Sequence, residues 1–136
     1  MSSGVTNLPK VAPPNAVQAV ELTFINSGAV GYLQMVVSVD ATHVKAANNN
    51  TTYANANCLG LALNASADGS NVRVLCFGTV TDPSFASLIL NRPLFCDTTG
   101  YLTQTAPGAP KFWVYCAKYV GGNTVFINIS PPVIQV

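Results

Sequence analysis

The side chains best suited to chemistry in this sequence are four cysteine thiols, which could bind a metal ion, form disulfides or remain free. They are spaced by 18, 20 and 20 residues, at Cys58, Cys76, Cys96 and Cys116. No two of them form the close Cys-x-x-Cys pair of most structural zinc sites. Each falls within or at the end of a predicted strand, so the spacing reflects the strand repeat. We therefore predict four free, largely buried thiols that pack as small hydrophobic groups, with a disulfide or a metal site as the alternatives.

The other candidates for catalysis are one histidine and a few scattered acids. His43 lies between Thr42 and Val44, where a surface or hydrogen-bonded role is more typical than that of a catalytic base. The acids are far apart in the sequence, at Glu21, Asp40, Asp68, Asp82 and Asp97. No pair is arranged as a general acid and base, and no serine has the surroundings of a nucleophile elbow. We predict a protein that is not an enzyme, with no catalytic residue, no cofactor and no metal ion.

Charge is unusually sparse: only 8% of the 136 residues are charged, against about a quarter in ordinary domains. Such a surface is poorly protected against association, so we expect an assembly that covers part of it. The six basic residues are scattered singly, which argues against binding to nucleic acid. No apolar run reaches the ~18 residues that span a bilayer, and the N-terminus lacks the pattern of a secretory signal. We therefore expect synthesis in a cytoplasm and no membrane partner.

The elements that must position these side chains are organised around residues 57–80. Apolar residues alternate along residues 58–63 and again along residues 72–77. The polar gap between the two runs contains Asp68-Gly69, which is a turn signal. This pattern predicts two antiparallel strands joined by a loop, with residues 78–80 extending or bulging the second strand.

Further strands are predicted from apolar runs between turn signals. They cover residues 19–25, 30–39, 93–97, 101–103, 112–120 and 124–129. The run over 30–39 is nearly continuous, which predicts a strand buried on both faces. The clearest hairpin joins the last two strands through Gly121-Gly122-Asn123. Residues 40–47 could form a short helix or another strand, and residues 84–90 a short helix.

Together these elements predict an all-β fold, namely a small antiparallel β-sandwich or β-barrel with at most one or two short helices. Its length suits one domain, which we place over residues 19–136. Residues 1–18 contain Pro9, Pro13 and Pro14 and are predicted to form an extended N-terminal arm. The arm either docks on a partner or is a disordered tail.

Two segments carry a recognisable pattern. Residues 60–69 read GLALNASADG and are followed by Val72-Arg73-Val74 and Gly78-Thr79-Val80, while residues 92–103 read RPLFCDTTGYLT. The first resembles a unit G-x-A-L-x-A-A-x-x-G-x-x-V-x-V with a later G-x-V, and the second resembles x-P-L-Y-x-D-x-x-G-x-x-T. Both units are similar to those of small, β-tulip-like proteins of tailed-bacteriophage virions, namely capsid decoration (cement) proteins and head-fibre base domains.

The resemblance implies a structural virion protein that is made in the host cytoplasm and resides on the capsid surface. Such proteins form oligomers, commonly homotrimers, over the junctions between neighbouring major capsid proteins, and so stabilise the shell. The major capsid protein and a second copy of the chain are therefore the expected partners. The predicted arm would reach the neighbouring subunit through single apolar residues, namely Val5, Leu8, Val11 and Val17.

A cluster of aromatic residues in the strand over 112–120 has two interpretations. We expect Phe112, Trp113, Tyr115 and Tyr119 to serve the strand core and the interface of the homotrimer. The alternative is a head- or tail-fibre adhesin module in which these rings, with the Asn-rich loop over 48–52, bind host surface glycans. Binding to isolated glycans would distinguish the two.

Overall fold

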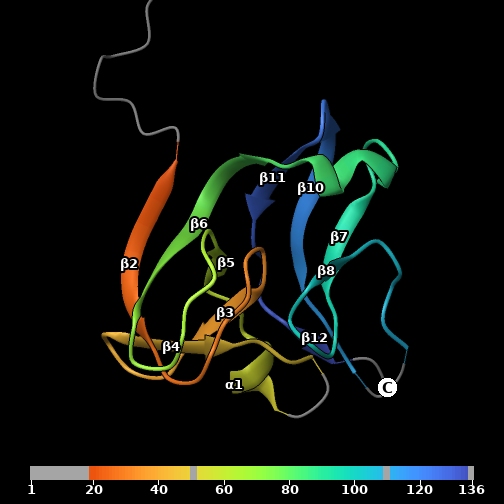
Figure 1. The fold of residues 1–136 in the computed structure, drawn as a ribbon. Helices are drawn as coiled ribbons and strands as arrows, with labels where there is room; N and C mark the ends of the chain where they lie inside the picture. The colour runs from red at the N-terminus through yellow and green to blue at the C-terminus, as the bar shows by residue number, and fades with distance from the viewer. Residues whose placement is uncertain (1–18, 50–51, 109–110, 135–136) are drawn as a thin grey trace, which may run out of the picture.

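The structure is a computed structural model that describes residues 19–49, 52–108 and 111–134. These residues form an all-β fold (Figure 1), as predicted. The strands are β2 (Val20–Asn26), β3 (Met35–Ser38), β4 (His43–Ala46), β5 (Gly60–Ala62), β6 (Asn71–Thr81), β7 (Pro93–Cys96), β8 (Leu102–Thr103), β9 (Phe112–Trp113), β10 (Tyr115–Gly121), β11 (Thr124–Asn128) and β12 (Val133–Ile134). The helical elements are α1 (Tyr53–Ala56) and the 3-10 helix η1 (Pro83–Ser87).

Five of the strands close into a ring. They follow the order β2-β4-β3-β5-β6, and β6 pairs back with β2. β2 and β4 run parallel, with Ile25 opposite His43, whereas the other pairs of the ring are antiparallel. The ring is therefore a small barrel, and the prediction of a purely antiparallel sheet is wrong at this one pair.

The long strand β6 joins this barrel to the rest of the sheet. Leu75 in its first half lies between Glu21 of β2 and Leu61 of β5. Phe77 lies between Val20 of β2 and Asn128 of β11. β5 and β11 therefore follow one another along the same edge of β6. From β11 the sheet continues through β10 and β7 to β8, and Figure 1 shows β6 arching from the barrel to this second part.

Two hydrophobic cores lie on opposite faces of the wall formed by β3, β5 and β6. The barrel interior holds small side chains, namely Val30, Val36, Val44, Ala62, Val72 and Val74. Met35 and Val37 point the other way, into a larger core that includes Leu94 of β7 and Ile127 of β11. Strand alternation places Val36 between them in the first core. The strand predicted over 30–39 is confined to Met35–Ser38, because the chain turns at residues 32–33. Within it Met35, Val36 and Val37 are buried on both faces, as predicted, and each contributes roughly 1.5–3 kcal/mol.

Local structure decides one open alternative and differs from the sequence-based expectation at two other places. Of the helix and the strand considered for residues 40–47, the structure contains the strand β4, because long-range pairing with β2 and β3 satisfies its backbone. The helix expected over 84–90 is η1, which starts earlier because Asp82 caps it and Pro83 opens it. The strand expected over 112–120 is interrupted at Val114, where β9 leaves to pair with β12.

Candidate binding surface

The four aromatic residues predicted to act together are divided by a β-bulge in β10. Tyr115 pairs with Phe95 and Ala117 with Leu94, so β10 carries one extra residue at this point. The bulge reverses the alternation of the strand. Side chains at 114 and 116 face the core before it, and those at 117 and 119 face the core after it.

Only two of the four rings share one exposed face. Trp113 and Tyr115 lie together there, with ring centroids 6.3 Å apart. Phe112 points to the other side and meets the Tyr53 ring edge-on at 6.2 Å. Tyr119 is 8% exposed and belongs to the larger core. Its hydroxyl accepts a hydrogen bond from the backbone N–H of Asn123. Because of the bulge, Tyr119 cannot contribute to an exposed aromatic surface. The subunit interface itself stays a prediction.

Phe95 holds the exposed pair in position. Its ring lies 4.9 Å from that of Tyr115 and 5.7 Å from that of Trp113. The indole Nε1–H of Trp113 donates to the carbonyl of Pro107 over 2.6 Å. The ring positions are therefore fixed by packing and by a hydrogen bond. Beside them is a hollow of about 660 Å³, whose other walls include Ile89, Arg92 and Gln104.

The same face continues onto β11 and β6. A smaller hollow of about 270 Å³ lies between Tyr115, Lys118 and Phe126. Phe126 meets Phe77 of β6 edge-on, with ring centroids 5.1 Å apart. We call this set, made of Phe77, Pro93, Phe95, Trp113, Tyr115 and Phe126, the aromatic face. Sequence reasoning missed Phe77 and Phe126 because their contact depends on the register between β6 and β11.

Two cations lie at the aromatic face. Arg92 lines the larger hollow and Lys118 the smaller one. The ion pairs found in the described part of the chain are Arg73 with Glu21 and His43 with Asp40, so neither cation of the face is paired there. The face is thus apolar, aromatic and weakly basic, which suits a partner surface with apolar groups and an acceptor.

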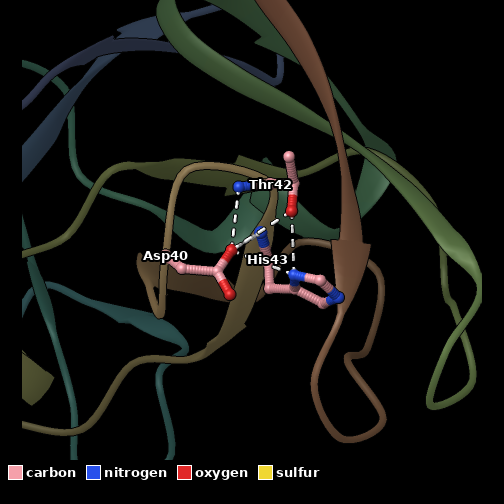
Figure 2. Close-up of polar contacts among 3 residues, drawn as sticks. All are labelled: Asp40, Thr42 and His43. Carbon is pink, nitrogen blue, oxygen red and sulfur yellow. Dashed lines mark hydrogen bonds and ion pairs between the residues drawn. The ribbon is translucent and has the colours of Figure 1, made fainter.

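The lone histidine belongs to a tight turn between β3 and β4 (Figure 2). Asp40 Oδ1 accepts from the backbone N–H groups of Thr42 and His43, each over 2.9 Å. His43 Nδ1 lies 2.9 Å from both Asp40 Oδ1 and Thr42 Oγ1. The Thr42 backbone N–H and the His43 side chain lower the pKa of Asp40 to about 2. These contacts give the histidine the hydrogen-bonded role that the sequence favoured.

The four cysteines are unpaired in the structure, which confirms that prediction. Cys58, Cys96 and Cys116 are buried and Cys76 is partly buried. The neighbouring Cys116 thiol and burial raise the pKa of Cys58, although the Cys96 thiol acts in the opposite direction. The Cys58 thiol and burial raise the pKa of Cys96. Within residues 19–49, 52–108 and 111–134, no group of three or more histidine, cysteine or acidic side chains is arranged to hold a metal ion.

The Asn-rich loop has a structural side chain at its start. Asn49 is 1% exposed, and its Nδ2 donates to the carbonyl of Cys96 over 2.9 Å. The backbone carbonyl of Asn49 accepts from the backbone N–H of Phe112 over 2.7 Å. Asn49 therefore ties the loop to β7 and β9 and is not exposed for a glycan. Residues 50–51 lie outside the described part.

The predicted arm over residues 1–18 also lies outside the described residues, together with its contact set Val5, Leu8, Val11 and Val17. In the part of the chain that is described, no helix is long and apolar enough to cross a membrane. Comparison of the chain with models of known protein families and with curated protein sequences gave no match.

Proposed function

We propose that this protein is a structural virion subunit that binds the outer surface of a phage capsid and bridges neighbouring major capsid proteins. The observation that carries the proposal is the aromatic face, an exposed apolar surface on a domain with only 8% charged residues. Tyr115 and Phe77 on this face are each about 40% exposed. A surface of this kind is typical of an interaction site. The capsid as the target comes from the resemblance of residues 60–80 and 92–103.

The glycines of the resembling segments have a structural role that supports their use as a fold signature. A Cβ on Gly60 would lie 2.5 Å from Val74 Cγ1 and 2.6 Å from the Leu75 carbonyl oxygen, so β5 and β6 approach too closely for a side chain. Gly100 has a φ of +90°, and its Cβ would lie 2.9 Å from the Ala47 carbonyl oxygen. Glycine is favoured at both positions, so these motifs describe the scaffold and not the contact surface.

In the proposed mechanism, the aromatic face joins copies of the chain into a homotrimer, and the predicted arms of each trimer contact the shell. Several weak contacts on one trimer act together, because the first contact raises the effective concentration of the others. A trimer that binds only the expanded shell stabilises that shell by linkage. At trimer concentrations well above the dissociation constant, the free energy of shell stabilisation rises linearly with the logarithm of trimer concentration.

The decisive experiment adds purified protein to expanded capsids that lack it. We expect saturable binding and release of DNA at a higher temperature than from bare shells.

A protein lacking residues 1–16 should keep its circular dichroism but bind with lower occupancy. A full-length variant with Val5, Leu8, Val11 and Val17 replaced by serine separates the apolar contacts from chain length. Equal binding by all three proteins would show that the arm makes no contact, and absence of binding by the full-length protein would refute the capsid role.

The alternative is a fibre adhesin module that binds host glycans. The observation in its favour is the hollow of about 660 Å³ beside Trp113 and Tyr115, with Arg92 at its wall. Aromatic rings with neighbouring donors are suited to the apolar and polar faces of a sugar. However, the Gln104 amide is occupied by the backbone of Ile89 and Arg92. Specific binding on a glycan array that is lost in Trp113→Phe and Tyr115→Phe would favour this function.

A further inference from the structure

A second hollow, separate from the aromatic face, lies between the loop before β3, η1 and β8. Its volume is about 400 Å³. The floor is apolar and is formed by Leu33, Phe85, Leu88, Leu94 and Leu102. The rim carries Tyr32, Tyr101 and the carboxylate of Asp82. We call this hollow the Asp82 pocket. Neither the capsid role nor the glycan alternative uses it.

The carboxylate at the rim is held in one position. Asp82 Oδ2 accepts from the Tyr32 hydroxyl over 2.7 Å, and Oδ1 accepts from the Ser84 N–H over 2.9 Å. The Asp82 backbone N–H donates to the carbonyl of Asn123 over 2.9 Å. An ionised carboxylate offers about four acceptor sites, so these two bonds leave capacity for a ligand.

The charge of this carboxylate is not neutralised within the described residues. The Ser84 N–H and the Tyr32 hydroxyl lower the pKa of Asp82, which keeps it ionised at neutral pH. The ion pairs among residues 19–49, 52–108 and 111–134 involve other acids, Glu21 and Asp40. A negative charge therefore stands over an apolar floor between two tyrosines that are 44% and 41% exposed.

The walls of the pocket are fixed by unusual local geometry. Leu33 has a φ of +65°, a left-handed conformation that costs a leucine free energy. Its N–H donates to the carbonyl of Ala62 over 2.8 Å, which holds it there. The Tyr101 hydroxyl lies directly over Gly31, where a Cβ would be only 2.2 Å from it. The pocket is thus formed before any ligand arrives, as binding sites usually are.

We propose that the Asp82 pocket binds one lysine or arginine side chain of a partner protein. The aliphatic stem would cover the leucine floor, and the cationic head would lie at the Asp82 carboxylate, beside the Tyr32 and Tyr101 rings. Charge complementarity favours this occupant over a neutral sugar, which would leave the carboxylate without a counter-charge over an apolar floor. The proposal rests on the pocket alone and does not depend on the virion role.

The test uses small probes of the two side-chain heads and follows backbone amide signals of the full-length protein by NMR. The probes are n-butylammonium and n-butylguanidinium, with n-butanol as the neutral control and methyl glucoside as the sugar control. We expect both cations to shift the amides of Ser84, Tyr101 and Leu102, with dissociation constants on the order of millimolar, as for other small fragments. Butanol should bind about two- to fivefold more weakly, the range expected for an exposed ion pair.

Two substitutions make the test specific. Asp82→Asn keeps an oxygen that accepts from the Ser84 N–H, so the fold should persist while cation affinity falls about two- to fivefold. Asp40→Asn is the matched control, since Asp40 is another exposed carboxylate bound to backbone N–H groups, and it should leave cation binding unchanged. Equal binding of butanol and the cations, retained cation binding in Asp82→Asn, or absence of any shift would overturn the proposal. Selective binding of the glucoside would assign the pocket to carbohydrate instead.

Discussion

At the residue scale, the Asp40 turn couples ionisation to folding. Its pKa is lowered to about 2 from a usual value near 3.8, because the folded state provides N–H donors to the carboxylate. A group with a lowered folded pKa stabilises the fold above its unfolded pKa, and this contribution is lost as pH falls through the folded pKa. We predict that the stability difference between the wild type and Asp40→Asn is largest above about pH 4 and shrinks towards pH 2.

Urea denaturation of the two proteins at several pH values measures this difference. Asp68→Asn is the control, because Asp68 caps a different loop through the N–H of Gly28. If the stability difference between the two proteins stays constant from pH 5 to pH 2 within the error of the extrapolation, the assigned cause is wrong.

The thiols also give a prediction at this scale. Cys76 is the least buried of the four, so we expect it to react first with a thiol reagent in the native protein. Cys58, Cys96 and Cys116 should react only as fast as the core opens, and all four should be titrated after denaturation without reductant. Cys76→Ser should remove the fast phase alone. Fewer than four thiols in the denatured protein would show that a disulfide forms.

At the scale of elements, the tight approach of β5 and β6 has a measurable cost. Gly60→Ala places a methyl group against Val74 and the Leu75 carbonyl oxygen, and rigid strands of the ring cannot easily move apart. We predict a loss of roughly 1–3 kcal/mol in the free energy of unfolding, measured by chemical denaturation. Gly108→Ala is the matched control, since its Cβ would meet no atom within 4 Å. Equal stability of the two variants would mean that the strands adjust.

The elements that could be predicted from sequence are those made by near neighbours in the chain. Alternation along 58–63 and 72–77 gave the β5–β6 pair, and the turn at Gly121-Gly122 gave the β10–β11 hairpin. The parallel pairing of β2 with β4 was missed, because nothing local in residues 40–47 distinguishes a strand from a helix. The four-residue helix α1 is too short to show a helical period.

The candidate surface was predicted only in part, for a related reason. Trp113 and Tyr115 were identified from their residue types, but the bulge at Cys116 that buries Tyr119 leaves no local signal. The Asp82 pocket was not foreseen, because Tyr32, Asp82 and Tyr101 lie on three connections that only the fold brings together.

At the scale of the whole molecule, the aromatic face predicts self-association. We expect sedimentation velocity at micromolar concentration to show a homo-oligomer, with a trimer as the expected species. Tyr115→Ser removes a ring at the centre of the face, where such a change typically costs 2 kcal/mol or more, or about a 30-fold rise in the dissociation constant. Tyr53→Ser is the matched control, because Tyr53 is also exposed but lies on α1. A monodisperse wild-type monomer would show that the aromatic face is not a subunit interface.

Closure of the ring has a consequence for the order in which the chain folds. Val20 pairs with Phe77 and Ile25 with Asn71. During synthesis β2 is therefore made some fifty residues before β6, its antiparallel partner. Until β6 is made, the backbone groups on the edge of β2 that faces β6 are unpaired and available to another nascent chain. Bringing together segments so far apart is entropically slow, and β proteins of this kind fold in milliseconds to seconds. We therefore expect the joining of β2 to β6 to be the late step of folding, and the step at which newly made chains are most exposed to aggregation.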